Sequence, residues 1–244
     1  LFEHPLLGAN LKTLGNAYRH YGAASWRCLP HTVFFYLSAF ARLPFALADQ
    51  IKLKRSDPEI NTVKNPVIIV GYWRSGTTHL HNLLGSSSRF GIITPLASGI
   101  PGEILSLGTW FESLLEKALP ETRGIDRVKV TAKSPQEDEI PLANMQLLSI
   151  FHALYFPSDF TNLFSKTVFF ENATPSEINL WMQSLNHFWK KISIHQNNKP
   201  LLIKNPVYTT RLKHLLEMFP DAKIIHIYRN PYRVYPSAVQ YFNN

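Results

Sequence analysis

The sequence predicts an α/β fold, a three-layer sandwich with helices on both faces of a central parallel sheet. Three short apolar runs, at 67–70, 201–203 and 223–228, alternate with longer segments in which apolar residues recur every three or four positions. Short buried strands that alternate with helices are typical of parallel sheets covered on both faces. A hydrophobic content of 45% over 244 residues is sufficient for such a core.

The N-terminal part of the chain differs from the rest. Residues 1–60 are expected to form a helical arm, followed by the α/β domain over residues 61–244. Within the arm, residues 32–48 are strongly apolar, but Arg42 and Pro44 interrupt this run, which is too short for a membrane span. Two interpretations fit: a helix packed on the domain, or a surface helix that lies on a membrane. Three basic residues would flank such a helix: Lys52, Lys54 and Arg55.

The elements of the domain follow in a regular order after a predicted linker at 56–66. A strand at 67–70 leads into a helix at 76–84, in which three leucines share one face. Residues 86–132 are rich in Gly, Pro and Ser and are expected to be irregular. Apolar periodicity then predicts helices at 141–156, 175–194 and 209–219, with the second strand before the last of these helices and the third strand after it.

The turn after the first strand has the layout of a phosphate-binding loop. Gly71 and Gly76 bound it and a helix follows, so backbone N–H groups and a helix N-terminus converge on one point. The glycine spacing equals that of the nucleotide kinase loop G-x-x-x-x-G-K-[ST], but Thr77 stands where that loop has its lysine. A cation lies inside the loop instead, at Arg74. The loop is therefore expected to hold a phosphate-like group without the usual residues for ATP and magnesium.

Cations follow all three predicted strands. Arg74 comes after the first strand, Lys204 after the second and Arg229 after the third. Because ligands of open α/β sheets bind beyond the carboxyl ends of the strands, these cations are expected at one rim. Pro231 follows Arg229 closely, and Ser237 lies eight residues after the arginine, in the predicted helix. An arginine in this position suits bidentate binding of a phosphate, which Ser237 is expected to contact as well.

Two motifs together resemble the sulfotransferase family that uses 3′-phosphoadenosine 5′-phosphosulfate. The family has a [KR]-[SA]-G-T-[ST]-x-L loop after its first strand, and residues 74–80 here are Arg-Ser-Gly-Thr-Thr-His-Leu. It has an R-x-P-x-x-x-x-x-S motif after a later strand, which Arg229, Pro231 and Ser237 match. Residues 134–139, Ser-Pro-Gln-Glu-Asp-Glu, resemble the bacterial-type branch. The resemblance covers roughly residues 66–242 and implies a P-loop NTPase-like sulfotransferase fold.

The resemblance implies a role for each matching residue. The loop would hold the 5′-phosphosulfate of the donor, and Arg229 and Ser237 would hold its 3′-phosphate. Lys204 corresponds in position to a family lysine that assists the leaving phosphate, so adenosine 3′,5′-bisphosphate would be the product. Where the cytosolic branch has a catalytic histidine two residues later, this chain has Pro206, which cannot accept a proton. The loop residues that would bind the donor are Arg74, Ser75, Gly76, Thr77 and Thr78.

The reaction that the resemblance implies is transfer of a sulfuryl group to a hydroxyl or amine acceptor. Negative charge then builds on the bridging oxygen of the donor, so fixed cations and N–H donors at that oxygen lower the barrier. Arg74 and Lys204 are the cations expected to act there. No metal is expected, because the loop lacks the kinase lysine and no clear aspartate follows a strand.

Three adjacent carboxylates at 137–139 are the first candidates for the general base, because neighbouring carboxylates raise one another's pKa. Glu137 and Glu139 are favoured among them. The alternative is a capping box, Ser134-x-x-Glu137, at a helix start, although Pro141 would then fall in the interior of that helix. The next candidates are two histidines of the helix after the loop, His79 and His81.

Composition limits the partners. The net charge of +8 favours anionic ligands, but nucleic acid is not expected, because the basic residues are scattered and no nucleic-acid-binding motif is present. The lone cysteine, Cys28, excludes an internal disulfide and is expected to be a packing residue. A cytoplasmic enzyme with a small-molecule, lipid or carbohydrate acceptor is predicted, and peripheral membrane contact through residues 32–55 is an open alternative.

Two other functions stay open. The chain could bind a nucleotide or a sulfated glycan without turnover, or it could be a degenerate P-loop kinase. Thr77 in place of lysine, and the pair Arg229 and Ser237, disfavour the kinase. The sequence does not begin with Met and stops at Asn244, soon after the second motif, so a C-terminally incomplete fragment is expected. The oligomeric state is not predicted.

Overall fold

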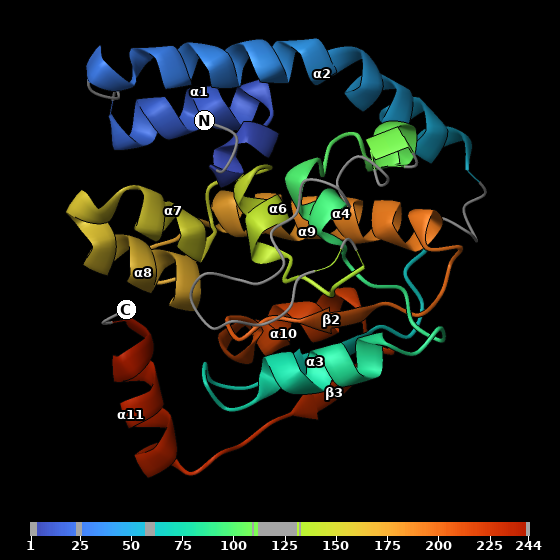
Figure 1. Ribbon diagram of the computed structural model, residues 1–244, viewed down its shortest axis with the longest axis vertical. Helices are drawn as coiled ribbons and strands as arrows, with labels where there is room; N and C mark the ends of the chain where they lie inside the picture. The colour runs from blue at the N-terminus through green and yellow to red at the C-terminus, as the bar shows by residue number, and fades with distance from the viewer. Residues whose placement is uncertain are drawn as a thin grey trace.

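The sheet at the centre of the fold is parallel, as predicted. The computed structural model describes residues 4–22, 26–56, 62–108, 110–111, 131 and 133–242. Among these residues, three strands pair in the order β2-β1-β3: β1 is Val67–Val70, β2 is Leu202–Lys204 and β3 is Lys223–His226. Figure 1 shows β2 and β3 in the lower half of the molecule. Ile68 of β1 lies opposite Ile203 of β2 and Ile224 of β3, so the carboxyl ends of the strands reach the same edge.

Helices cover both faces of the sheet, which confirms the predicted sandwich. On one face, Ile68 packs in a large apolar cluster with Trp189 and Tyr208. On the other face, Ile69 packs against Leu84 in a smaller cluster. Because β1 and β2 are fully buried between these layers, their residues are mostly apolar on both sides rather than alternating, whereas β3, at one edge of the sheet, is only partly buried. The covering helices are α9 (Pro175–His195) and α10 (Tyr208–Met218) on the first face and α3 (Thr77–Gly85) on the second.

The single helix predicted at 141–156 is wrong, because the chain forms two short helices in this region. A buried side chain contacts two backbone carbonyl oxygens at the break: His152 Nε2 lies 3.0 Å from that of Ala143 and 3.2 Å from that of Gln146. Such side-chain partners let the backbone leave a helix inside the core without losing hydrogen bonds. The two helices are α6 (Glu139–Ala143) and α7 (Ile150–Tyr155).

The helix predicted at 175–194 is confirmed. It begins where Thr174 and Glu177 form a capping box, with Pro175 at the first helical position.

The segment 86–132, predicted to be irregular, contains the short helix α4 (Pro95–Gly99) in its described part. The remaining elements of the domain are η3 (Pro157–Asp159), α8 (Phe160–Phe169) and α11 (Pro231–Phe242), which extends away from the sheet in Figure 1.

The described N-terminal residues are largely helical, and the longest of their helices runs along the upper edge of the molecule in Figure 1. Its inner side is held to the rest of the chain by buried ion pairs. Arg42 Nη1 lies 2.9 Å from Glu103 Oε1, and Asp49 Oδ2 lies 3.4 Å from Lys191 Nζ. These elements are η1 (Pro5–Gly8), α1 (Leu11–Tyr21), η2 (Trp26–Cys28) and α2 (Leu29–Arg55).

Two expectations for this region need correction. Cys28 is exposed at the end of η2, so it is not a packing residue. Part of the predicted linker belongs to the core, because Val63 is buried in the same cluster as Ile68. The predicted boundary at residue 60 falls within residues 57–61, which lie outside the described residues.

Candidate active site

The loop between β1 and α3 presents its backbone to the carboxyl edge of the sheet. Gly71, Arg74 and Gly76 have positive φ values of 144°, 65° and 106°. Gly76 is the N-cap of α3, and no described side chain caps this helix. The first N–H groups of α3 lack intrahelical partners and carry the positive end of the helix dipole. The loop and helix therefore have the backbone layout that the glycine spacing predicted, and anion binding by this loop stays a prediction.

Gly71 is required for the shape of this loop. A Cβ at this position would lie 2.4 Å from the carbonyl oxygen of Ile227, which follows β3, and φ is 144°. Gly71→Ala is expected to lower the free energy of unfolding, measured by urea denaturation, by about 1–3 kcal/mol. The matched control is Gly99→Ala, where a Cβ meets no described atom within 4 Å. A control variant as unstable as Gly71→Ala would contradict the steric explanation.

The two predicted phosphate motifs meet in the structure. Arg74 Nε donates a hydrogen bond to Ser237 Oγ at 3.0 Å, across 163 residues of sequence. Arg229 Nη1 donates to the carbonyl oxygen of Arg74 at 3.2 Å. Arg229 is exposed, whereas Arg74 and Ser237 are half-buried. The loop after β1 and the segment after β3 thus form one polar surface at the edge where ligands of parallel sheets bind.

Lys204, at the end of β2, joins the helix after the loop to the predicted carboxylates. Its Nζ lies 3.2 Å from Thr78 Oγ1 and also donates to Glu137 Oε1. The Lys204 side chain is only 3% exposed, whereas that of Glu137 is 31% exposed. A buried ammonium group with fixed partners is preorganised for charge stabilisation, and the more exposed carboxylate can be reached by a substrate.

Asp138 holds the carboxylate segment from inside the core. Its side chain is fully buried, and burial raises the pKa of Asp138 while its hydrogen bonds oppose that rise. Asp138 follows Glu137 in the chain, and Asn205 follows Lys204. The hydrogen bond from Asn205 to Asp138 therefore holds together the two segments that carry the Lys204–Glu137 pair. Sequence reasoning missed this positioning role of Asp138. Its signal in the sequence was Asn205, a polar residue directly after a buried strand. The donors to Asp138 are Trp189 Nε1 at 2.9 Å, Asn205 Nδ2 at 2.9 Å and the Tyr208 hydroxyl.

Glu139, the other carboxylate predicted to act as a base, points into the core. Its Oε1 lies 3.4 Å from Arg211 Nη1, and both side chains are 1% exposed. Burial raises the pKa of Glu139 to about 7, and the Arg211 charge opposes this rise. The guanidinium lies 4.5 Å from the ring centroid of Phe170 and 4.9 Å from that of Trp181. The catalytic role of Glu139 stays a prediction, and the geometry favours Glu137 as the general base.

The remaining sequence candidates lie in other surroundings. The capping box starting at Ser134 is wrong, because α6 begins at Glu139 with Asp138 as its N-cap. His81 is buried with Nε2 3.3 Å from the Leu202 carbonyl oxygen, whereas His79 is exposed. In the part of the chain that the structure describes, no group of three His, Cys, Asp or Glu side chains is arranged to hold a metal. A metal-free reaction stays a prediction.

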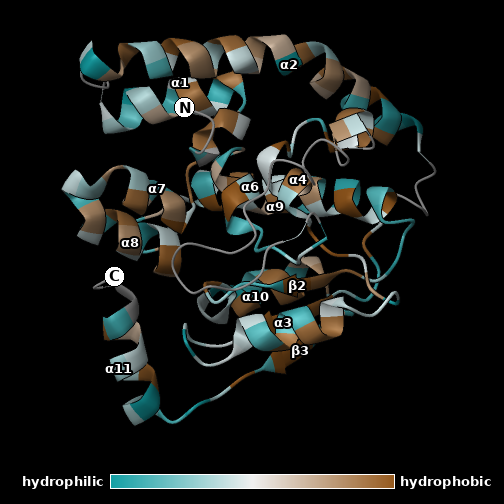
Figure 2. Ribbon diagram, viewed as in Figure 1, coloured by the Kyte–Doolittle hydropathy of each residue, from teal (hydrophilic) through white to brown (hydrophobic). Residues whose placement is uncertain are grey.

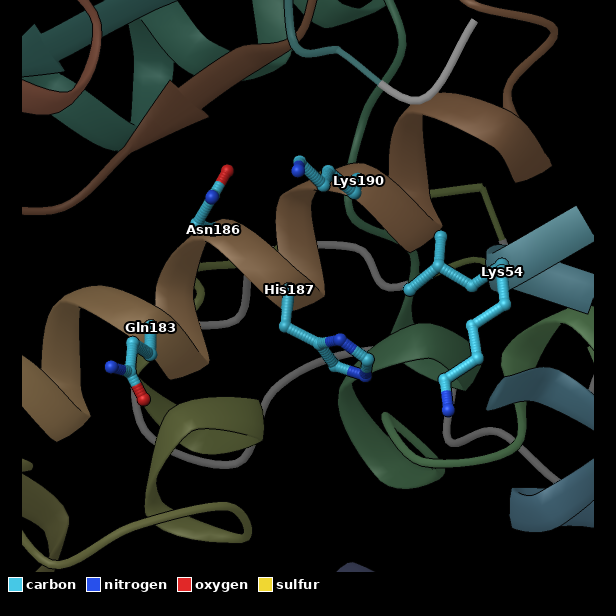
Figure 3. Close-up of a pocket in the computed structure, with 6 residues that line it drawn as sticks. Lys54, Gln183, Asn186, His187 and Lys190 are labelled. Carbon is cyan, nitrogen blue, oxygen red and sulfur yellow. The ribbon is translucent and has the colours of Figure 1, made fainter. Parts of the chain in front are cut away.

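A separate surface pocket lies between α2 and α9 (Figure 3). It shares no residue with the loop after β1 or with the Lys204–Glu137 pair. It is therefore distinct from the predicted site. The described residues that line it are Leu53, Lys54, Gln183, Asn186, His187 and Lys190.

A parallel sheet covered by helices, with a glycine-bounded loop between β1 and α3, defines a P-loop-like α/β protein. The family model described as "Sulfotransferase family" matches residues 66–244 of this chain. The chain belongs to this family.

Proteins of mycobacteria are similar to this chain. Omega-hydroxy-beta-dihydromenaquinone-9 sulfotransferase Stf3 is 35% identical over 174 residues in both Mycobacterium bovis and Mycobacterium tuberculosis, covering 71% of this chain and 44% of the relative. The fold resembles sulfotransferase STF9 of Mycobacterium avium, with a TM-score of 0.58 and 16% identity over 97% of this chain and 66% of that one. It also resembles STF1 of Mycobacterium tuberculosis, with a TM-score of 0.53 and 20% identity over 90% of this chain and 60% of that one. The chain spans less than half the length of the curated relatives.

Proposed function

We propose that this chain transfers a sulfuryl group from 3′-phosphoadenosine 5′-phosphosulfate to the hydroxyl group of an apolar, lipid-like acceptor. Membership of the sulfotransferase family supports the reaction class. The choice of donor rests on the hydrogen bond between Arg74 of the loop and Ser237 of the second motif, with Arg229 beside them. A donor with anionic groups at both its 5′ and 3′ positions requires two adjacent anion sites, and these two neighbouring motifs would supply them.

Each end of the donor has suitable partners. The N–H groups at the start of α3, together with Arg74, suit the 5′-phosphosulfate, because helix N-termini and guanidinium groups both favour such anions. Arg229 and Ser237 suit the 3′-phosphate, since an exposed guanidinium can bind a phosphate with two parallel hydrogen bonds. When bound, the donor supplies a sulfuryl group activated by its bond to a phosphate.

Lys204 and Glu137 would handle charge and the proton at the reacting centre. Lys204 Nζ, positioned by Thr78 Oγ1, is a fixed cation for the negative charge that develops on the phosphate side. Glu137 would accept the proton from the acceptor hydroxyl, and its partial exposure leaves room for that hydroxyl. Pro206 offers no base in this region, and Glu139 is enclosed in the core.

The acceptor class is inferred from the relatives. The two curated relatives are named for an omega-hydroxy menaquinone, which combines a terminal hydroxyl group with a long apolar body. An acceptor of the same kind, a hydroxyl group carried by an isoprenoid or another lipid chain, is therefore the first to test on this chain.

Calorimetry with adenosine 3′,5′-bisphosphate tests the donor site. Arg74→Ala and Arg229→Ala are each expected to raise the Kd about 10- to 100-fold, because hydrogen bonds to charged groups contribute about 1.5–3 kcal/mol. Added Mg²⁺ is expected to have little effect. Arg89→Ala, which removes an exposed arginine beyond α3, is the matched control and should bind as the wild type does.

Two results would overturn the proposal. Unchanged affinity in both Arg74→Ala and Arg229→Ala would remove the predicted donor site. Tighter binding of Mg²⁺-ATP than of the bisphosphate, lost in the same variants, would favour the kinase alternative instead.

A further inference from the structure

The outer side of α2 carries a row of exposed apolar side chains, here called the α2 stripe. Its members recur at intervals of three, four or seven residues, so they share one face of the helix. Leu37 and Phe40, near its middle, are 61% and 67% exposed. Figure 2 shows brown, apolar segments in the middle part of α2, at the edge of the molecule. The α2 stripe consists of Leu29, Val33, Leu37, Phe40, Leu47 and Ile51.

The inner side of α2 is already occupied by polar contacts. Arg42 Nη2 donates hydrogen bonds to the carbonyl oxygens of Leu7 at 2.9 Å and Ala9 at 2.8 Å. Asp49 Oδ2 accepts a hydrogen bond from the Leu105 N–H at 2.9 Å. These contacts fix the rotation of the helix about its axis, so the α2 stripe faces away from the core. Contiguous exposed apolar surface of this kind marks docking sites.

The exposed charges of α2 have one sign. Asp49 is the only acidic residue of the helix, and it is 0% exposed, so the exposed surface of α2 carries no carboxylate. Arg55 continues the spacing of the stripe, four residues after Ile51, and Lys52 and Lys54 lie beside it at the same end. An apolar face with a basic end complements anionic lipid headgroups above acyl chains.

The pocket beside Lys54 extends this basic end. Figure 3 shows the side chains of Lys54 and His187 reaching into the space between α9 and α2. Lys190 and two amide side chains complete the polar lining, and none of the six described residues that line it is acidic. A pocket lined by N–H donors suits the phosphate of a lipid headgroup.

We propose that α2 lies flat on an anionic lipid surface, with the α2 stripe among the acyl chains and its basic end at the headgroup phosphates. By length and composition, the helical stretch from Trp26 to Arg55 could also cross a membrane. Crossing would separate Arg42 from Glu103 and Asp49 from Lys191, leaving charges in the bilayer, whereas lying flat keeps both ion pairs. This placement does not depend on the proposed sulfuryl transfer.

Vesicle sedimentation with the full chain tests the placement. Vesicles of equimolar phosphatidylglycerol and phosphatidylcholine should bind the protein, whereas vesicles of phosphatidylcholine alone should bind it far more weakly. High salt should release the protein from the anionic vesicles. The double variant Leu37→Ser with Phe40→Ser is expected to bind about 30-fold more weakly or worse, because both side chains leave the acyl region. The matched control is Leu83→Ser in α3, where the leucine is 62% exposed but lies off the α2 stripe.

The charges are tested separately. Lys54→Gln and Arg55→Gln should each weaken binding to the anionic vesicles about five-fold, without the fold being at risk. Equal binding to both vesicle types would overturn the proposal, as would equal losses in the α2 stripe variant and the Leu83→Ser control. The proposal would also be overturned if the protein bound no vesicles and instead self-associated in sedimentation equilibrium. If the α2 stripe variant abolished that self-association, this face would be assigned to a second copy of the chain.

Discussion

Glu137→Gln is expected to reduce turnover by about 10²- to 10⁴-fold, the usual contribution of a general base, while the affinity for adenosine 3′,5′-bisphosphate is retained. The amide keeps the size of the side chain and can still accept the hydrogen bond from Lys204 Nζ, but it cannot take a proton. The measurement is release of the bisphosphate from the donor in the presence of a hydroxylated isoprenoid quinone, with kcat and KM determined separately.

Two companion variants make this result specific. Glu171→Gln removes an exposed carboxylate beyond α8 and should leave turnover unchanged. His79→Asn removes the exposed histidine of α3, the next candidate for the base. Full activity of Glu137→Gln would refute its role as the base, and a large loss in His79→Asn alone would transfer that role to α3.

Arg211→Ala is expected to lower the free energy of unfolding by about 3–5 kcal/mol at neutral pH, because it leaves the Glu139 carboxylate buried without its cation. The pair is 1% exposed on both sides, so water cannot replace the lost partner. The guanidinium also covers the rings of Phe170 and Trp181, and this contact is lost in the same variant. Urea denaturation of the purified variant measures the loss.

The deficit of Arg211→Ala should shrink in acid. Burial raises the pKa of Glu139 from 4.5 to about 7 in the intact protein, and removal of Arg211 removes the main opposing charge, so the pKa rises further. A carboxyl group whose pKa is higher in the folded state stabilises the fold fully below its unfolded-state pKa, and this stabilisation is lost as pH rises through the folded-state pKa. The variant should therefore be closer to the wild type at about pH 5 than at about pH 8.

A double variant separates charge from packing. Arg211→Met combined with Glu139→Gln removes both charges while keeping most of the volume, and it should recover much of the stability lost in Arg211→Ala. A double variant as unstable as the single one, with a deficit independent of pH, would show that packing rather than the unpaired charge governs this position.

The sequence was sufficient for the strands, most of the helices and the two phosphate motifs. A strand buried on both faces is apolar throughout, and a tight anion-binding turn needs glycine at fixed positions, so both features are local and visible in the residues themselves. The helix predicted at 141–156 failed for a non-local reason. His152 supplies contacts for the carbonyl oxygens of the break, and nothing in the local periodicity reveals that partnership.

Composition and spacing by themselves determined the sheet, the loop from Gly71 to Gly76 and the order of the cations along the chain. Only the tertiary structure decided which of three neighbouring carboxylates reaches Lys204. Glu137 lies just before α6, so its side chain can face the site while those of Asp138 and Glu139 are buried in the core. The start of α6 at Glu139 and the hydrogen bond between Asp138 and Asn205 set this arrangement, and the hydrogen bond joins segments that are distant in sequence.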